Sequence, residues 1–301
     1  KVFGKHLNKN FFQKEIIMNF INKNLNFKKY KKPYPYIVFE NFLDKDFYKK
    51  IYEKFPSIDD FKKYPNKVNR MHFDTSYSEP LYNSLIEKVP AYQKFHNFIY
   101  SKKFMDYIID KFKDDIALEI KNKNLKNIFE YSYHCNPYEV RKILSKKDFS
   151  KKTKETVLYP RLDIGAGLKG YGKINGGKGV HVDNPQRLVS ILFYVGGYSK
   201  INGGEFRVWK KDNNKLKIDN SIKPLPNLMI ASLQNNISFH DVNPVLEIEG
   251  SRNAFYIAIS ASSSIWKNIK NNDFNEKYHK NRVQAKTNKT FTFLRALKII
   301  K

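Results

Sequence analysis

The sequence predicts an α+β protein in which a mostly helical first half precedes an antiparallel β structure. Between residues 79 and 131, apolar residues recur at intervals of three and four, the spacing of a helix with one buried face. After Tyr159 the spacing shortens towards two, and β-branched and aromatic residues fill short runs separated by Gly, Asn and Pro. Several short strands with no helix between them are typical of an antiparallel sandwich or barrel.

The predicted elements begin with residues 33–42, which are rich in β-branched and aromatic residues and predict a strand. Residues 43–55 carry apolar residues at helical spacing and predict a helix. The Asn-Gly step in Ile201–Glu205 predicts a hairpin turn, because these residues accept the positive φ that a tight turn needs. The strands predicted in the second half are Leu188–Val195, Glu205–Trp209, Leu228–Leu233, Ile237–Phe239 and Asn253–Ser260.

The same patterns divide the chain into four parts. Residues 1–33 are a basic N-terminal extension, residues 34–155 a mostly helical supporting region, residues 156–265 a β-rich core and residues 266–301 a basic C-terminal tail. Within the tail, the apolar spacing predicts an amphipathic helix over Phe291–Ile300.

The charge of the chain is concentrated at its two ends. Residues 1–33 hold nine Lys against one Glu, and residues 266–301 hold ten Lys and Arg against one Asp and one Glu, so the ends supply +16 of the net +27. Clustered basic residues can bind nucleic acid or an acidic partner. No aromatic recognition motif accompanies them, so we expect a solvated lysine-rich surface instead.

Cysteine content and hydropathy exclude several classes. The single Cys135 excludes internal disulfides and zinc sites that need two or more Cys, so any metal must be held by His and carboxylates. The longest uncharged apolar stretch, Leu188–Tyr198, is about half as long as a membrane span requires. No apolar segment typical of a cleavable signal precedes Lys14. We therefore expect a cytoplasmic protein that does not cross a membrane.

One His-x-Asp motif has the features of an iron site. His181 and Asp183 directly precede a predicted strand, and His240 follows 59 residues after His181. Residues at i and i+2 of extended backbone point the same way, so His181 and Asp183 can hold one face of a metal while a neighbouring strand delivers His240. Two His and one carboxylate suit non-haem Fe(II) and leave positions open for O₂ and a bidentate cosubstrate.

A second motif of the same form is assigned to structure. His72-Phe-Asp74 is followed by His134, which repeats the spacing. With 29 acidic residues in 301, each of the seven His has about a one-in-ten chance of such a match, so the motif alone is weak. The residues between these positions have a helical period and predict no pair of strands converging on a metal.

Five motifs together resemble those of the Fe(II)/2-oxoglutarate oxygenases, with the greatest likeness to the prolyl 4-hydroxylases, including the oxygen-sensing prolyl hydroxylases. The likeness covers residues 156–262 and, more weakly, Pro33–Phe55. The motifs are His181-Val-Asp-Asn-Pro, Ile191-Leu-Phe-Tyr-Val, Asn202-Gly-Gly-Glu-Phe-Arg-Val-Trp, His240-Asp-Val-Asn-Pro-Val and Ser251-Arg-Asn-Ala-Phe-Tyr-Ile.

The resemblance implies a role for each matching residue. His181, Asp183 and His240 would be the iron ligands, and Arg252 would bind the distal carboxylate of 2-oxoglutarate through its guanidinium fork. Tyr194 would donate its hydroxyl to that carboxylate, with an ordinary core tyrosine as the alternative.

The implied fold is a double-stranded β-helix, a jelly roll of the cupin type, with supporting N-terminal helices. Gly203-Gly204 resembles the family's turn that lets one strand pass close to its neighbour. The chain departs from the oxygen-sensing relatives in the spacing from His240 to Arg252, which is somewhat longer and allows Arg252 a different position in the site.

The implied activity is a dioxygenase that hydroxylates a C–H bond and releases succinate and CO₂. Its cofactors would be Fe(II), 2-oxoglutarate as cosubstrate and O₂, with ascorbate as a candidate reductant. The family-based substrate is a prolyl residue in a protein or peptide, and the alternatives are a small metabolite or saccharide, or a non-catalytic jelly-roll binding module. Relatives that repair nucleic acid carry a second Arg six residues beyond the first, where this chain has Ala258.

The segment Gly165–Gly179 is unusually rich in glycine directly before the first implied ligand. We expect a lid or substrate loop, because such a loop needs conformational freedom. The alternative of a phosphate-binding loop lacks the full glycine spacing and a following helix.

Overall fold

The structure is a computed structural model. It describes residues 20–62, 70–73, 79–140, 155–170, 179–213 and 215–266. Residues 267–301 of the C-terminal tail, with its expected helix Phe291–Ile300, and residues 1–19 of the basic N-terminal extension lie outside the described residues.

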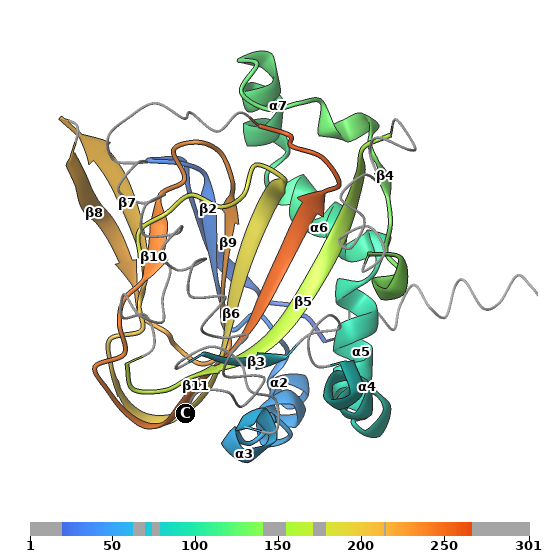
Figure 1. Ribbon diagram of the computed structural model, residues 1–301, viewed down its shortest axis with the longest axis vertical. Coiled ribbons are helices and arrows are strands. Elements are labelled where there is room, and N and C mark those ends of the chain that lie inside the picture. Colours follow the sequence, from blue (N-terminus) through green and yellow to red (C-terminus); the bar gives the residue numbers. More distant parts are fainter. Residues whose placement is uncertain are drawn as a thin grey trace, which may run out of the picture. The chain divides into compact units, whose positions relative to one another are not determined.

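Two sheets, antiparallel except for the parallel pair of β4 and β5, face each other and form a jelly roll (Figure 1). The smaller sheet has the order β10 (His240–Val242), β7 (Phe206–Asp212) and β8 (Lys215–Ile222). The larger sheet has the order β1 (Asn26–Tyr30), β2 (Tyr36–Glu40), β9 (Leu228–Leu233), β6 (Arg187–Asn202), β11 (Glu247–Ala261), β5 (Val157–Gly167) and β3 (Arg70–Phe73), with the short β4 (Ser132–Tyr133) paired to β5. The predicted α+β class with a double-stranded β-helix is confirmed.

Helices cover the outer face of the larger sheet, on the side opposite β7, β8 and β10 (Figure 1). Side-chain caps fix two of their starts: Asp44 accepts from the backbone N–H groups of Asp46 and Phe47, and Ser101 accepts from that of Phe104. The helices are α2 (Lys45–Glu53), α3 (Ile58–Lys62), α4 (Glu79–Lys88), α5 (Pro90–Ile99), α6 (Lys102–Lys111), α7 (Lys113–Lys121) and the 3₁₀ helix η1 (Ile128–Glu130).

Alternation along the strands sends apolar side chains to both faces of the larger sheet. In β6, Val189, Ile191 and Phe193 pack with the helices, whereas Leu192 and Tyr194 lie in the cluster between the two sheets. A strand that is buried on both faces reads as a continuous apolar run, which is why the sequence marks β6 so clearly.

Among the described residues, no helix is long and apolar enough to span a membrane.

The predicted strand Ile237–Phe239 is wrong. The side chains of Asn235 and Ser238 bond to nearby backbone groups and turn the chain there: Asn235 accepts from the N–H of Ile237, and the Ser238 hydroxyl accepts from that of Asn235. The observed strand, β10, begins at His240, directly after the end of the predicted one.

The predicted hairpin at Ile201–Glu205 is also wrong. The chain turns there, and Gly203 and Gly204 adopt φ values of +89° and +81°. The turn nevertheless joins β6 of the larger sheet to β7 of the smaller sheet, which do not pair with each other. Gly203 and Gly204 therefore allow the chain to cross from the larger sheet to the smaller one.

Candidate metal centre

Backbone pairing brings the two predicted histidine ligands side by side. The N–H of His181 donates to the carbonyl of His240 at 3.0 Å, and the N–H of His240 donates to that of His181 at 2.9 Å. With Asp183, two residues along the chain, they form a group whose ligand atoms all lie within 4.8 Å of one another. The structure therefore brings together the three residues that the sequence predicts as iron ligands.

Both imidazoles are held in the tautomer that leaves Nε2 available. Nδ1 of His181 lies 2.8 Å from the carbonyl of Gly179, and Nδ1 of His240 lies 2.8 Å from that of Ser238. A carbonyl oxygen only accepts, so each Nδ1 must carry the hydrogen. The two Nε2 atoms lie 3.6 and 4.0 Å from the oxygens of Asp183. Two neutral imidazoles and one carboxylate, oriented by backbone acceptors, fit a divalent iron.

Asp183 and His240 are oriented by side chains that the sequence analysis missed. The hydroxyl of Ser190, on β6, donates to Oδ2 of Asp183. The ring of Phe206, on β7, stacks on His240 with centroids 5.5 Å apart. The alternation of β6 could have placed Ser190 on the inner face, but a serine in an apolar strand carries no signal that names its partner.

Arg252, the residue predicted to bind the cosubstrate, is fully buried on β11. Its guanidinium donates to the carbonyl of Gly204 at 3.3 Å and to the hydroxyl of Tyr256 at 2.9 Å. Both acceptors are neutral, and a buried cation with such acceptors is well suited to an anionic ligand. Tyr256 was not predicted.

Tyr194 lies beside Arg252, as the resemblance implies. Its ring is 5.3 Å from the Arg252 guanidinium carbon, and its hydroxyl donates to the carbonyl of Gly204 at 3.1 Å. A Cβ atom on Gly203 would lie 2.0 Å from the carbonyl oxygen of Pro244, and one on Gly204 would lie 3.0 Å from Cδ of Arg252. The close approach expected at this turn therefore requires glycine.

Tyr34 is a further residue near the metal centre, in the buried cluster between the two sheets, that the sequence analysis missed. Its hydroxyl is buried among the inter-sheet residues and has no hydrogen-bond partner among the described residues. Burial raises the pKa of this phenol well above 10, and the negative charges of Tyr36 and Asp183 raise it further, so it stays protonated.

The remaining predicted motifs do not join the metal centre. His134 lies on the surface with Nδ1 3.2 Å from Glu139, and within the described ranges only the one group of three metal-ligating side chains occurs. His72 lies on β3 opposite Gly165, and Asp74 lies outside the described residues. Of the glycine-rich segment, Gly165–Gly167 belongs to β5 and is not a loop, while residues 171–178 lie outside the described residues.

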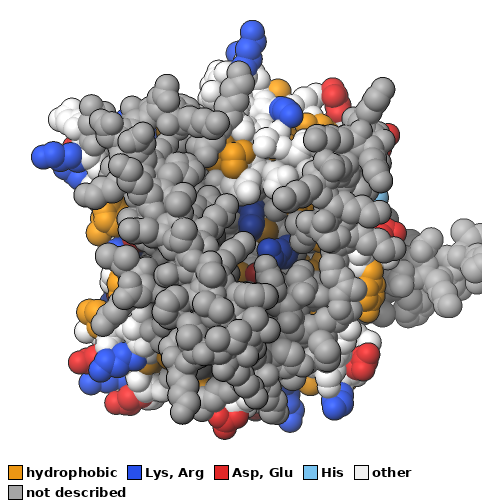
Figure 2. Space-filling view, in the orientation of Figure 1, with side chains coloured by type: hydrophobic (Ala, Val, Ile, Leu, Met, Phe, Trp, Pro, Cys, Tyr) orange, Lys and Arg blue, Asp and Glu red, His pale blue; other side chains and the backbone are white. Residues whose placement is uncertain are grey.

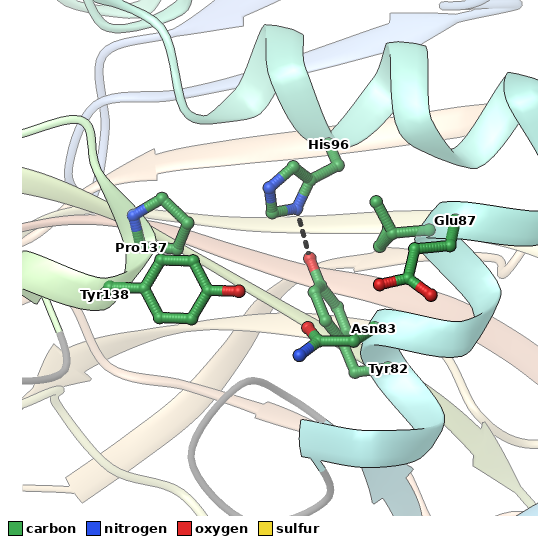
Figure 3. A pocket seen from close by; sticks show the side chains of 7 residues that line it. Tyr82, Asn83, Glu87, His96, Pro137 and Tyr138 are labelled. Atoms are coloured by element: carbon green, nitrogen blue, oxygen red, sulfur yellow. Dashed lines mark hydrogen bonds between the residues drawn. The ribbon is translucent and has the colours of Figure 1, made fainter.

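A separate pocket lies between α4, α5 and the segment at Pro137 (Figure 3). Its volume is about 110 Å³, and Tyr82 and His96 meet in it with the hydroxyl 2.7 Å from Nδ1. Burial lowers the pKa of His96 to about 4, so the imidazole is neutral at pH 7. None of the predicted site residues lines this pocket.

The fold and the donor set define a jelly-roll metal centre of the iron oxygenase type. Residues 166–258 match the model of the 2OG-Fe(II) oxygenase superfamily. This segment is therefore a 2OG-Fe(II) oxygenase domain, and the predicted superfamily and its cofactors, Fe(II) and 2-oxoglutarate, are confirmed. A search of curated protein sequences finds no significant match.

Several solved structures are similar to the chain. A prolyl 4-hydroxylase structure from Phytophthora capsici is 15% identical, with a TM-score of 0.42 over 75% of this chain and 58% of that chain. A Trichoplax adhaerens prolyl hydroxylase in complex with a hypoxia inducible factor peptide fragment is 12% identical, with a TM-score of 0.41 over 85% and 94%. A Pseudomonas putida prolyl-4-hydroxylase is 11% identical, with a TM-score of 0.27 over 67% and 96%. The chain thus spans less than two thirds of the first of these structures.

Proposed function

We propose that this protein is an Fe(II)- and 2-oxoglutarate-dependent hydroxylase in which His181, Asp183 and His240 bind the iron. The observation that carries the proposal is the convergence of these three donors within 4.8 Å, with both imidazoles presenting Nε2. When bound, Fe(II) with 2-oxoglutarate and O₂ supplies the oxidant for C–H hydroxylation, with release of succinate and CO₂.

In this proposal the chain's own residues bind the iron and the cosubstrate, orient the groups that bind them, and exclude water from the site. The carbonyls of Gly179 and Ser238 hold the imidazoles in the required tautomer, and Ser190 fixes one oxygen of Asp183. Arg252 binds the distal carboxylate of 2-oxoglutarate, and because Arg252 is fully buried its charge is little screened by solvent. Tyr194 holds Arg252 in place through ring contact, and its hydroxyl turns to the same carboxylate when that ligand is bound.

For the substrate we propose a prolyl residue of a protein or peptide. This proposal rests on the likeness of the five motifs to the prolyl 4-hydroxylases. The cytoplasmic location expected from the sequence stays a prediction.

Anaerobic titration with Fe(II) and 2-oxoglutarate tests the function. An iron-bound 2-oxoglutarate gives a metal-to-ligand charge-transfer band, and we expect this band in the wild type and not in His181→Ala or Asp183→Ala. Arg252→Ala should chiefly weaken 2-oxoglutarate binding, by about tenfold to a hundredfold for a charge-assisted hydrogen bond.

The matched control is Lys217→Gln, which removes an exposed cation on β8 and should leave the band unchanged. A wild type without the band would identify a non-catalytic jelly-roll module. Normal succinate release by His181→Ala or Asp183→Ala would contradict the assignment of these ligands.

A further inference from the structure

The strand β5 carries a charged pair on the inner face of the larger sheet. Leu158, Leu162 and Ile164 pack against the helices, so the alternate side chains of Arg161 and Asp163 point to the opposite face, towards the smaller sheet. A charged pair on the face that also carries the metal centre is unusual, because inner faces of a jelly roll are mainly apolar.

Strand register places Arg161 level with the metal centre. Arg161 pairs with Ala258 of β11, and Ala258 pairs with Ser190 of β6. The hydroxyl of Ser190 donates to the ligand Asp183. Two strand spacings separate Arg161 from Ser190, which is about 10 Å between Cα atoms. The residue between them, Ala258, is buried and has a small side chain, so no bulky group of β11 separates Arg161 from Ser190.

Asp163 orients the guanidinium of Arg161. The Arg161 Nε donates to Oδ1 of Asp163 at 2.9 Å, and the aspartate side chain is 10% exposed whereas that of the arginine is 29% exposed. Asp163 is therefore the more buried side chain of the pair, and that of Arg161 is the more exposed one. Figure 2 shows Lys or Arg side chains near the middle of the view, in the region where Figure 1 draws β6 and β11.

A second cation lies near the first. The pKa of Tyr159, which burial raises, is lowered in part by the positive charges of Arg187 and Arg161, so both guanidinium groups lie within electrostatic reach of this phenol. Tyr159 and Arg187 both pair with Ser260 of β11, in the row next to that of Arg161. Arg187 is therefore a second cation, one row along the sheet from the row of Arg161 and Ser190.

We propose that Arg161, anchored by Asp163 and assisted by Arg187, is a specificity-determining residue that binds a carboxylate of the substrate beside the carbon to be hydroxylated. The inference rests on the proposed function and adds a substrate class to it: an acidic molecule or segment. An arginine fork matches a carboxylate in two charge-assisted hydrogen bonds, which are about twice as strong as those that a neutral substrate group accepts.

The test compares substrates that differ only in this charge. One pair of peptides contains proline flanked by Glu or by Gln, and a second pair is free L-proline and L-prolinamide. The first pair probes a side-chain carboxylate and the second an α-carboxylate. We measure succinate release with saturating Fe(II) and 2-oxoglutarate, and expect the acidic member of at least one pair to have a KM about tenfold to a hundredfold lower.

Variants assign the preference to the arginine. Arg161→Gln should abolish the preference for the acidic member and leave the KM for 2-oxoglutarate unchanged, whereas Arg161→Lys should keep part of it. Lys49→Gln, which removes an exposed cation of α2, should change neither constant. The charge-transfer band of each variant confirms that it is folded and loaded with iron.

Two results would overturn the inference. One is a wild type that binds Fe(II) and 2-oxoglutarate but releases no more succinate with either acidic probe than with its neutral counterpart. The other is an acidic preference that persists in Arg161→Gln. A wild type with no charge-transfer band would contradict the proposed function itself, so the two failures are distinguishable.

Discussion

Ser190→Ala should weaken metal binding without unfolding the protein. The substitution removes the only hydroxyl of β6 that donates to Asp183 among the described residues, and leaves all three ligands in place. A hydrogen bond to a charged group contributes about 1.5–3 kcal/mol. Loss of this bond lets the carboxylate rotate and corresponds to about a tenfold to hundredfold rise in the Kd for Fe(II), as is usual for residues that orient a ligand.

The assay is an anaerobic competition between the protein and a chelator of known affinity, with Fe(II) as the probe. Ser232→Ala is the matched control, because Ser232 is a buried serine opposite Ser190 on β9 whose hydroxyl donates to a backbone carbonyl and not to a ligand. An unchanged Kd in Ser190→Ala, or an equal rise in Ser232→Ala, would refute the reasoning that this hydroxyl orients Asp183.

Three further predictions concern stability. The pKa of His96 is about 4 in the folded protein and 6.5 in the unfolded chain, so the unfolded state binds more protons between these pH values. At about 1.4 kcal/mol per pKa unit, the protein should lose about 3 kcal/mol of unfolding free energy as the pH falls from 7 to below 4. Denaturant titrations of His96→Gln at these pH values should lack this loss. Tyr34→Phe should raise the unfolding free energy by about 1 kcal/mol, because a buried hydroxyl without a partner among the described residues is removed; a loss of stability would show that the hydroxyl has a partner. Gly203→Ala should lower the unfolding free energy by about 2 kcal/mol or more, because φ is +89° and the new Cβ meets the Pro244 carbonyl. A variant with the same midpoint of thermal unfolding as the wild type would contradict this.

The metal ligands could be predicted because their geometry is local. His181 and Asp183 are two residues apart, and extended backbone alone sends their side chains the same way. His240 could be proposed only as a histidine that follows a neighbouring predicted strand, and the resemblance supported it, since no local pattern shows which distant strand will lie beside His181. Ser190 and Tyr34 could not be predicted, because their roles depend on which side chains the two sheets bring opposite them.

The strands that were missed have weak patterns for physical reasons. β8 (Lys215–Ile222) is an edge strand with few buried residues, so lysines and other polar residues occupy most of its positions. β5 (Val157–Gly167) contains a proline, two glycines and the Arg161–Asp163 pair, which break the apolar run expected of a central strand. Of these residues, Arg161 and Asp163 face the smaller sheet, so two polar residues that obscure the strand pattern are those for which we propose a role at the site.

The turn at Gly204 links the metal end of the cavity to the cosubstrate end. Its N–H donates to the carbonyl of Asn243, three residues after the ligand His240, and its carbonyl accepts from both Tyr194 and Arg252. A displaced turn would therefore move His240 and Arg252 together. It follows that Gly203→Ala should weaken the binding of Fe(II) and of 2-oxoglutarate in parallel, whereas Ser190→Ala should weaken Fe(II) alone in a titration without 2-oxoglutarate. Independent changes in the two affinities of Gly203→Ala would show that the two ends of the cavity are held separately.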